Sequence, residues 1–94
     1  MVKILAHDYE VSIEILVGDD GTEEKGRTYP AHNRIIISPN QCRQMQESAL
    51  VHEIFEVLNY SMGLGLSHQQ LMSLEAGWYQ VLNDNPKLLG KAKP

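Results

Sequence analysis

The sequence predicts an α+β fold, in which a small N-terminal antiparallel sheet of about three strands packs on a C-terminal helical hairpin. Residues 1–38 contain short runs rich in valine and isoleucine, whereas apolar residues recur at helical spacing between residues 46 and 82. Only a few residues connect the two helical segments, so we expect them to form an antiparallel or crossed hairpin. A chain of 94 residues supports one modest core, which predicts a single domain over residues 1–86 and a short basic tail, 87–94.

The first two apolar runs predict a β-hairpin. Residues 1–6 form one run and residues 9–17 form the other. The second run alternates as a half-buried strand does, and one of its faces carries Val11, Ile13 and Ile15. His7 and Asp8 stand between the runs, where a tight turn would reverse the chain.

Residues 18–26 predict a loop, and residues 33–38 predict the third strand. The loop is rich in glycine and acidic residues, but it lacks the alternating ligands and closing glutamate of an EF-hand, which argues against calcium. Three consecutive isoleucines, at positions 35–37, are typical of a strand that is covered on both faces.

Two helices account for the rest of the chain. Ser38 and Pro39 predict a helix start, and the helix itself is expected over about residues 46–62, before the glycines at 63 and 65. Ser67, followed three residues later by Gln70, predicts a capping box for the second helix. Its apolar stripe, which we expect to be buried, comprises Leu71, Leu74, Trp78, Val81 and Leu82.

Charge and composition exclude several classes of protein. The formal net charge is −4 and the eight lysines and arginines are scattered, which argues against a nucleic-acid-binding protein. The single cysteine, Cys42, excludes an internal disulfide and fits a reducing compartment. The first apolar run is too short for a signal peptide or a membrane span, so we expect a cytoplasmic protein without a membrane partner.

The first helix carries the pattern His-Glu-x-x-Glu at His52, Glu53 and Glu56. Residues four apart lie about 6 Å from each other on a helix surface, so His52 and Glu56 can bind one metal ion. The pattern differs by one residue from His-Glu-x-x-His, in which two histidines bind zinc and the glutamate is the general base of a metallopeptidase. A polar face on an ordinary surface helix would look the same.

A catalytic zinc site needs a third protein ligand, and the second helix offers His68 and Glu75. In a strictly antiparallel hairpin Glu75 lies closer to the level of Glu56. A site formed by His52, Glu56 and Glu75 would, however, contain two carboxylates. Their charges would cancel that of the ion and raise the pKa of a water bound to it. His68 would instead complete a set of two histidines and one carboxylate, provided that the helices cross or open.

The chain resembles the small phage- and prophage-encoded zinc metallopeptidases, minimal relatives of the gluzincin-like domains in phage-repressor-cleaving proteases. The resemblance rests on residues 50–56, 66–68, 74–75 and 79–86, and it extends to the opening strands and the isoleucine strand. Family members commonly have His-Glu-x-x-His on the first helix and Leu-Ser-Glu near the start of the second. Here Glu56 and His68 occupy those places, which implies that His52, Glu56 and His68 bind the zinc. The resemblance also implies that Ile35–Ser38 binds substrate as an added strand.

Three functions follow from these observations. The first is a zinc-dependent peptidase acting on a peptide or protein, with Glu53 as general base and Tyr79 steadying the oxyanion. The second is a non-catalytic module that binds a protein partner. The third is a structural metal site in which Glu75 is a fourth ligand. The two other histidines, His7 and His32, are expected to be exposed to solvent.

Overall fold

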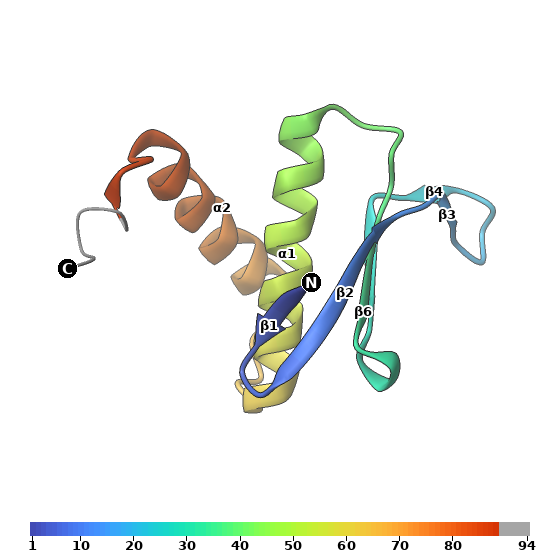
Figure 1. The fold of residues 1–94 in the computed structure, drawn as a ribbon, viewed down its shortest axis with the longest axis horizontal. Coiled ribbons are helices and arrows are strands. Elements are labelled where there is room, and N and C mark those ends of the chain that lie inside the picture. The colour runs from blue at the N-terminus through green and yellow to red at the C-terminus, as the bar shows by residue number, and fades with distance from the viewer. Residues whose placement is uncertain (89–94) are drawn as a thin grey trace.

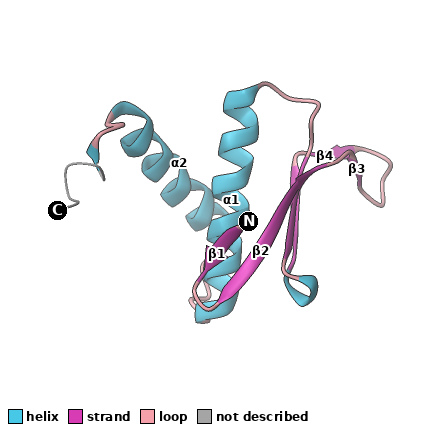
Figure 2. Ribbon diagram, viewed as in Figure 1, coloured by secondary structure: helices cyan, strands magenta, loops and turns pink. Residues whose placement is uncertain are grey.

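The computed structural model describes residues 1–88 and confirms the predicted α+β fold (Figure 1). A four-stranded sheet packs on one side of the first helix and the second helix packs on the other (Figures 1 and 2). The elements are β1 (Val2–Ile4), β2 (His7–Ile13), β3 (Leu16–Val17), β4 (Glu23–Glu24), β5 (Gly26–Tyr29), a 3-10 turn (Pro30–His32), β6 (Arg34–Ile37), α1 (Arg43–Met62) and α2 (His68–Asp84). Most of the predicted basic tail, residues 89–94, lies outside the described residues.

The main sheet is mixed and has four strands in the order β1-β2-β6-β5, rather than about three antiparallel strands. The hairpins β1–β2 and β5–β6 are antiparallel, but β6 runs parallel to β2. The extra strand is β5. A 3-10 turn connects it to β6, and the two strands pair, so that β6 lies in the middle of the sheet. The central place suits β6 because it is apolar on both faces, and Ile35, Ile36 and Ile37 are indeed buried.

The predicted first hairpin forms, but its turn and the length of its buried face differ from the prediction. The turn lies at Leu5 and Ala6, where Leu5 has a positive φ of 55°, and His7 already belongs to β2. Tyr9 is the buried residue of β2, whereas Ile13 is exposed and the strand ends there. The alternation identified the correct face, since Tyr9 and Val11 pack into the core, but burial ends before Ile13. A short strand within the predicted loop, β4, pairs with β3 at the end of the second predicted run.

Helix α1 begins at Arg43, later than the Ser38-Pro39 pair predicts. Ser38 is buried, and its hydroxyl accepts a hydrogen bond from the backbone N–H of Asn40 at 3.2 Å, so it caps a turn rather than the helix. The helix ends at Gly63, whose left-handed conformation (φ 60°) provides a C-cap. No helix within residues 1–88 is long and apolar enough to cross a membrane.

The two helices cross, and α2 diverges from α1 towards its C-terminal end (Figure 1). The side chain of Asn59 fixes the connection, because it accepts a hydrogen bond from the Leu66 N–H (3.0 Å) and donates one to the Leu66 carbonyl (3.2 Å). The predicted capping box of Ser67 and Gln70 forms at the start of α2. The predicted burial of the apolar stripe is wrong in part: Leu71 is buried, but Leu74, Trp78 and Val81 are exposed.

Candidate metal centre

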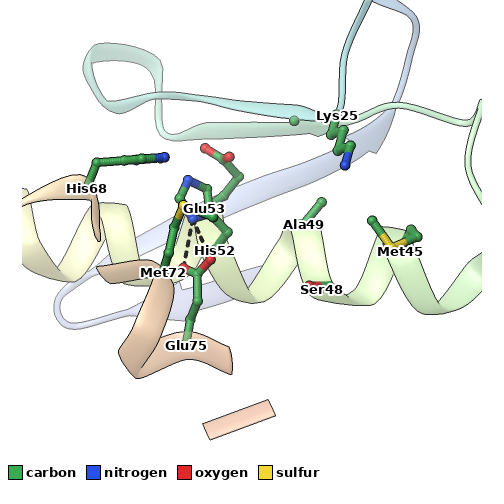
Figure 3. A pocket seen from close by; sticks show the side chains of 10 residues that line it. Lys25, Met45, Ser48, Ala49, His52, Glu53, His68, Met72 and Glu75 are labelled. Carbon is green, nitrogen blue, oxygen red and sulfur yellow. Dashed lines mark hydrogen bonds and ion pairs between the residues drawn. The ribbon is translucent and has the colours of Figure 1, made fainter. Parts of the chain in front are cut away.

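Two clefts, each of about 390 Å³, meet at His52, Glu53 and His68. Strand β5 forms one wall of both clefts, α1 forms the floor, and the first turns of α2 close the other side (Figure 3). One cleft extends towards the start of α1 and is also lined by Lys25, Gly26, Met45, Ser48, Ala49, Met72 and Glu75. The other extends towards the end of α1 and is also lined by Gly26, Arg27, Thr28, Pro30, Glu56, Val57 and Tyr60.

His52 is held from α2 by Glu75. The Nδ1 atom of His52 lies 2.8 Å and 2.7 Å from the two carboxylate oxygens of Glu75 (Figure 3). An ionised carboxylate can only accept hydrogen bonds, so the proton of a neutral His52 belongs on Nδ1. The lone pair of Nε2 is then free to bind a metal. In metalloproteins, a carboxylate bound to the other ring nitrogen commonly orients a histidine ligand in this way.

The structure brings together three of the four predicted metal ligands. His52, Glu56 and His68 each offer one ligand atom, and these atoms lie within 4.8 Å of one another. Within residues 1–88 this is the one group of three or more histidine, cysteine, aspartate or glutamate side chains that could hold a metal ion. Nε2 of His52 lies 3.8 Å from Oε1 of Glu56. The rings of His52 and His68 are arranged edge to face, with their centroids 5.5 Å apart.

These separations are close to those of a zinc site. Tetrahedral zinc with ligand bonds of about 2.0–2.1 Å places neighbouring ligand atoms about 3.4 Å apart. The group therefore needs to contract by about 1 Å or slightly more at its widest separation. His68 is exposed and can turn about its side-chain bonds, and in Figure 3 it already points towards His52 and Glu53.

Glu75, the fourth predicted ligand, lies on the Nδ1 side of His52, away from the Nε2 atom that faces Glu56. The prediction that favoured it assumed strictly antiparallel helices. Because the helices cross, the start of α2 reaches the level of Glu56 and His68 comes close instead. Glu75 is placed to orient a ligand, which argues against a closed structural site with four ligands.

Glu53 is the most enclosed charged residue of the site, with 7% of its surface exposed. The hydroxyl of Thr28, on β5, donates a hydrogen bond to its Oε1 at 2.8 Å. Burial raises the pKa of the Glu53 carboxyl above its ordinary value, although the Thr28 hydrogen bond and the charge of His52 act in the opposite direction. A carboxyl of raised pKa accepts and holds a proton more readily near neutral pH.

No pattern in the sequence pointed to Gly26 and Thr28, the two β5 residues that lie against Glu53. A Cβ atom at Gly26 would lie 3.1 Å from Ile37 Cδ1, 3.3 Å from the Ile36 carbonyl oxygen and 3.4 Å from Glu53 Cγ. Glycine thus avoids crowding Ile36 and Ile37 of β6 and leaves room for Glu53 of α1. Thr28 lies two residues further along the strand, on the same face, and reaches the carboxylate.

The stability of chelator-treated protein should reveal the raised pKa of Glu53. Because the folded state holds this proton more tightly than the unfolded state, the free energy of unfolding falls as pH rises from the ordinary pKa of 4.5 through the raised value. Glutamine cannot titrate, so Glu53→Gln escapes this loss. In EDTA, we expect the Tm of the variant relative to that of the parent to be higher at pH 8 than at pH 4. An equal difference at both pH values would contradict the prediction.

Two predicted functional segments lie elsewhere. Tyr79 lines neither cleft, and it stands beside Glu47: burial, and after it the charge of Glu47, raises the pKa of the tyrosine hydroxyl. The prediction that Ile35–Ser38 adds a substrate strand is wrong, because β6 pairs with β2 on one side and β5 on the other. The edge strand beside the site is β5. His7 and His32 are exposed, as predicted.

Comparisons with family models, with curated proteins and with solved structures find no match to this chain.

Proposed function

We propose that the protein is a zinc-dependent metallopeptidase that cleaves extended peptide segments. The observation that carries the proposal is the group of His52, Glu56 and His68, with ligand atoms within 4.8 Å, beside the buried carboxyl of Glu53. Two imidazoles and one carboxylate are a ligand set of catalytic zinc. The resemblance of the helical pair to phage-encoded zinc metallopeptidases supports the same reaction.

The donor atoms favour zinc over calcium or magnesium. Two of the three ligands are imidazole nitrogens, whereas calcium and magnesium prefer oxygen ligands. Glu56 would supply one negative charge to the ion, and Glu75 accepts a hydrogen bond from Nδ1 of His52 rather than adding a second ligand charge. With three protein ligands, a position remains for water or for the substrate carbonyl.

Each residue of the chain then has a distinct part in hydrolysis. Zinc, when bound, supplies a Lewis acid and lowers the pKa of a water molecule that it binds to about 7. Glu53 takes the proton that this water gives up and later returns it to the leaving amine. Thr28 holds one carboxylate oxygen of Glu53, and Glu75 keeps His52 in the orientation that directs Nε2 to the ion.

Strand β5 is the surface on which we expect the substrate to lie. It is an edge strand, so one side of its backbone is free to pair with an extended peptide, and it forms a wall of both clefts. A peptide paired with Gly26–Tyr29 would run from one cleft to the other and pass over Glu53. The scissile carbonyl would then be placed near His52 and His68.

Metal content is the direct test of this proposal. Protein purified without a metal-affinity tag should contain stoichiometric zinc by inductively coupled plasma mass spectrometry. His52→Ala should reduce the zinc content at least about tenfold, because removing even an indirect support of a ligand costs about 10–100-fold in affinity. His7→Ala is the matched control, since His7 is an exposed histidine of β2, and it should retain full zinc content. Equal zinc content in the parent and in His52→Ala would contradict the proposal.

A further inference from the structure

Helix α2 carries an exposed apolar stripe on the side away from the metal centre. Leu74, Trp78 and Val81 are 57%, 44% and 36% exposed, although they follow the i, i+4, i+7 spacing of one helix face. The residues of α2 that pack towards α1 are instead Leu71, Glu75, Tyr79 and Leu82. The stripe is therefore independent of the cleft and of the proposed reaction.

The composition of α2 is that of an interface rather than of a solvated surface. The helix has no lysine or arginine, and its acidic residues are Glu75, which binds His52, and Asp84 in the last turn. The helix neighbours of the stripe, three or four residues away, include two charged residues and are otherwise apolar or neutral polar: Gln70, Leu71, Glu75, Gly77, Leu82, Asp84 and Asn85. Interface cores are depleted of charge and enriched in tryptophan, and Trp78 lies at the centre of the stripe.

We propose that a second copy of this chain covers the stripe, in a two-fold symmetric dimer with antiparallel α2 helices. The stripe is symmetric about the midpoint between Gly77 and Trp78: Leu74 and Val81 lie at equal distances from it along the sequence. In an antiparallel pair centred there, Leu74 contacts Val81 of the partner subunit, and Trp78 packs over Gly77 of the partner subunit. Such self-complementarity is what a two-fold interface requires.

The backbone and the charges favour the same arrangement. A Cβ atom at Gly77 would meet nothing within 4 Å in its own chain, so the space above this glycine is open to a neighbouring side chain. Antiparallel pairing aligns the helix dipoles favourably. It also places Asp84 beside the first turn of α2 of the partner subunit, where a negative charge is stabilising.

Dimerisation is tested on the full chain by sedimentation equilibrium and by the fluorescence of Trp78, the single tryptophan. We expect a mass of twice 10.6 kDa at high concentration and a red shift of the emission on dilution, as Trp78 becomes exposed. A monomer at every concentration up to about 1 mM, the range of the weakest specific associations, would overturn the proposal.

Three substitutions distinguish this interface from others. Gly77→Leu removes the space for the tryptophan of the partner while improving the helix propensity of α2, so a correctly folded monomer is the expected result. Leu74→Glu should raise the dimer dissociation constant at least about 30-fold, the effect of losing a central interface residue. Ile15→Glu is the control, because Ile15 is 61% exposed but lies outside α2, and it should leave the dimer intact. A dimer that survives Gly77→Leu and Leu74→Glu would overturn the proposal.

The antiparallel register has its own test. In a Cys42→Ser background, an equal mixture of Leu74→Cys and Val81→Cys proteins should form a disulfide-linked dimer under mild oxidation. Each variant alone should cross-link at least about tenfold less, because residue 74 faces residue 81 rather than itself. Cross-linking that is as efficient within each variant as in the mixture would contradict this register.

Discussion

Glu53→Gln is expected to lower the rate of peptide hydrolysis by about 10²–10⁴-fold, the usual contribution of a general base, while the zinc content stays unchanged. Glutamine preserves the size of the side chain and can still accept the hydrogen bond from Thr28, but it cannot take a proton. Hydrolysis is measured by mass spectrometry of a mixture of unstructured peptides, with zinc content determined on the same protein. Glu53 is only 7% exposed, so the substitution leaves the protein surface almost unchanged and the loss of rate can be assigned to the buried carboxylate.

Two controls make the result specific. Glu56→Gln should lose both zinc and hydrolysis, because Glu56 is one of the three residues that would bind the ion. Tyr79→Phe should retain most of the hydrolysis, since Tyr79 lies beside Glu47 and outside both clefts. If a folded Glu53→Gln protein keeps its full biological activity, the assignment as a peptidase is contradicted. That result would favour the alternative, a non-catalytic module that binds a partner protein.

Zinc is expected to raise the Tm of chelator-treated protein by about 15–30 °C at a free concentration 1,000 times its Kd. Binding to the folded state alone adds about 4 kcal/mol to the free energy of unfolding under that condition, and each kcal/mol shifts the Tm of a domain of this size by about 4–8 °C. The ion would join α1 to the diverging α2, whose one buried residue within His68–Asp84 is Leu71. Differential scanning calorimetry with and without zinc measures the shift.

His68→Ala should abolish most of this stabilisation, because it removes the ligand that α2 supplies. His32→Ala is the matched control: His32 is an exposed histidine in the 3-10 turn, and the variant should respond to zinc like the parent. A full zinc response in His68→Ala would contradict the assignment of His68, and Glu75→Ala would then be the variant to compare.

Local features of the fold were predictable from the sequence because local interactions determine them. Ser67 and Gln70 form the capping box that their spacing predicts, and Gly63 ends α1 as a left-handed C-cap. The isoleucine run of β6 is buried on both faces, as its composition indicates. The place of β6 between β2 and β5 depended on how the two hairpins associate, which no local pattern shows. Because both edges of β6 are paired, its predicted role in substrate binding was wrong.

The sequence by itself determined that His52, Glu53 and Glu56 lie on one helix at metal-binding spacing, because helical periodicity fixes which side chains are neighbours. Only the tertiary structure decided which residues of β5 and α2 meet them. The crossing of the helices brought His68 to the ligand group and placed Glu75 behind His52, and the same divergence of α2 left Trp78 exposed. Crossing angles arise from packing between residues far apart in the chain, which no local pattern encodes.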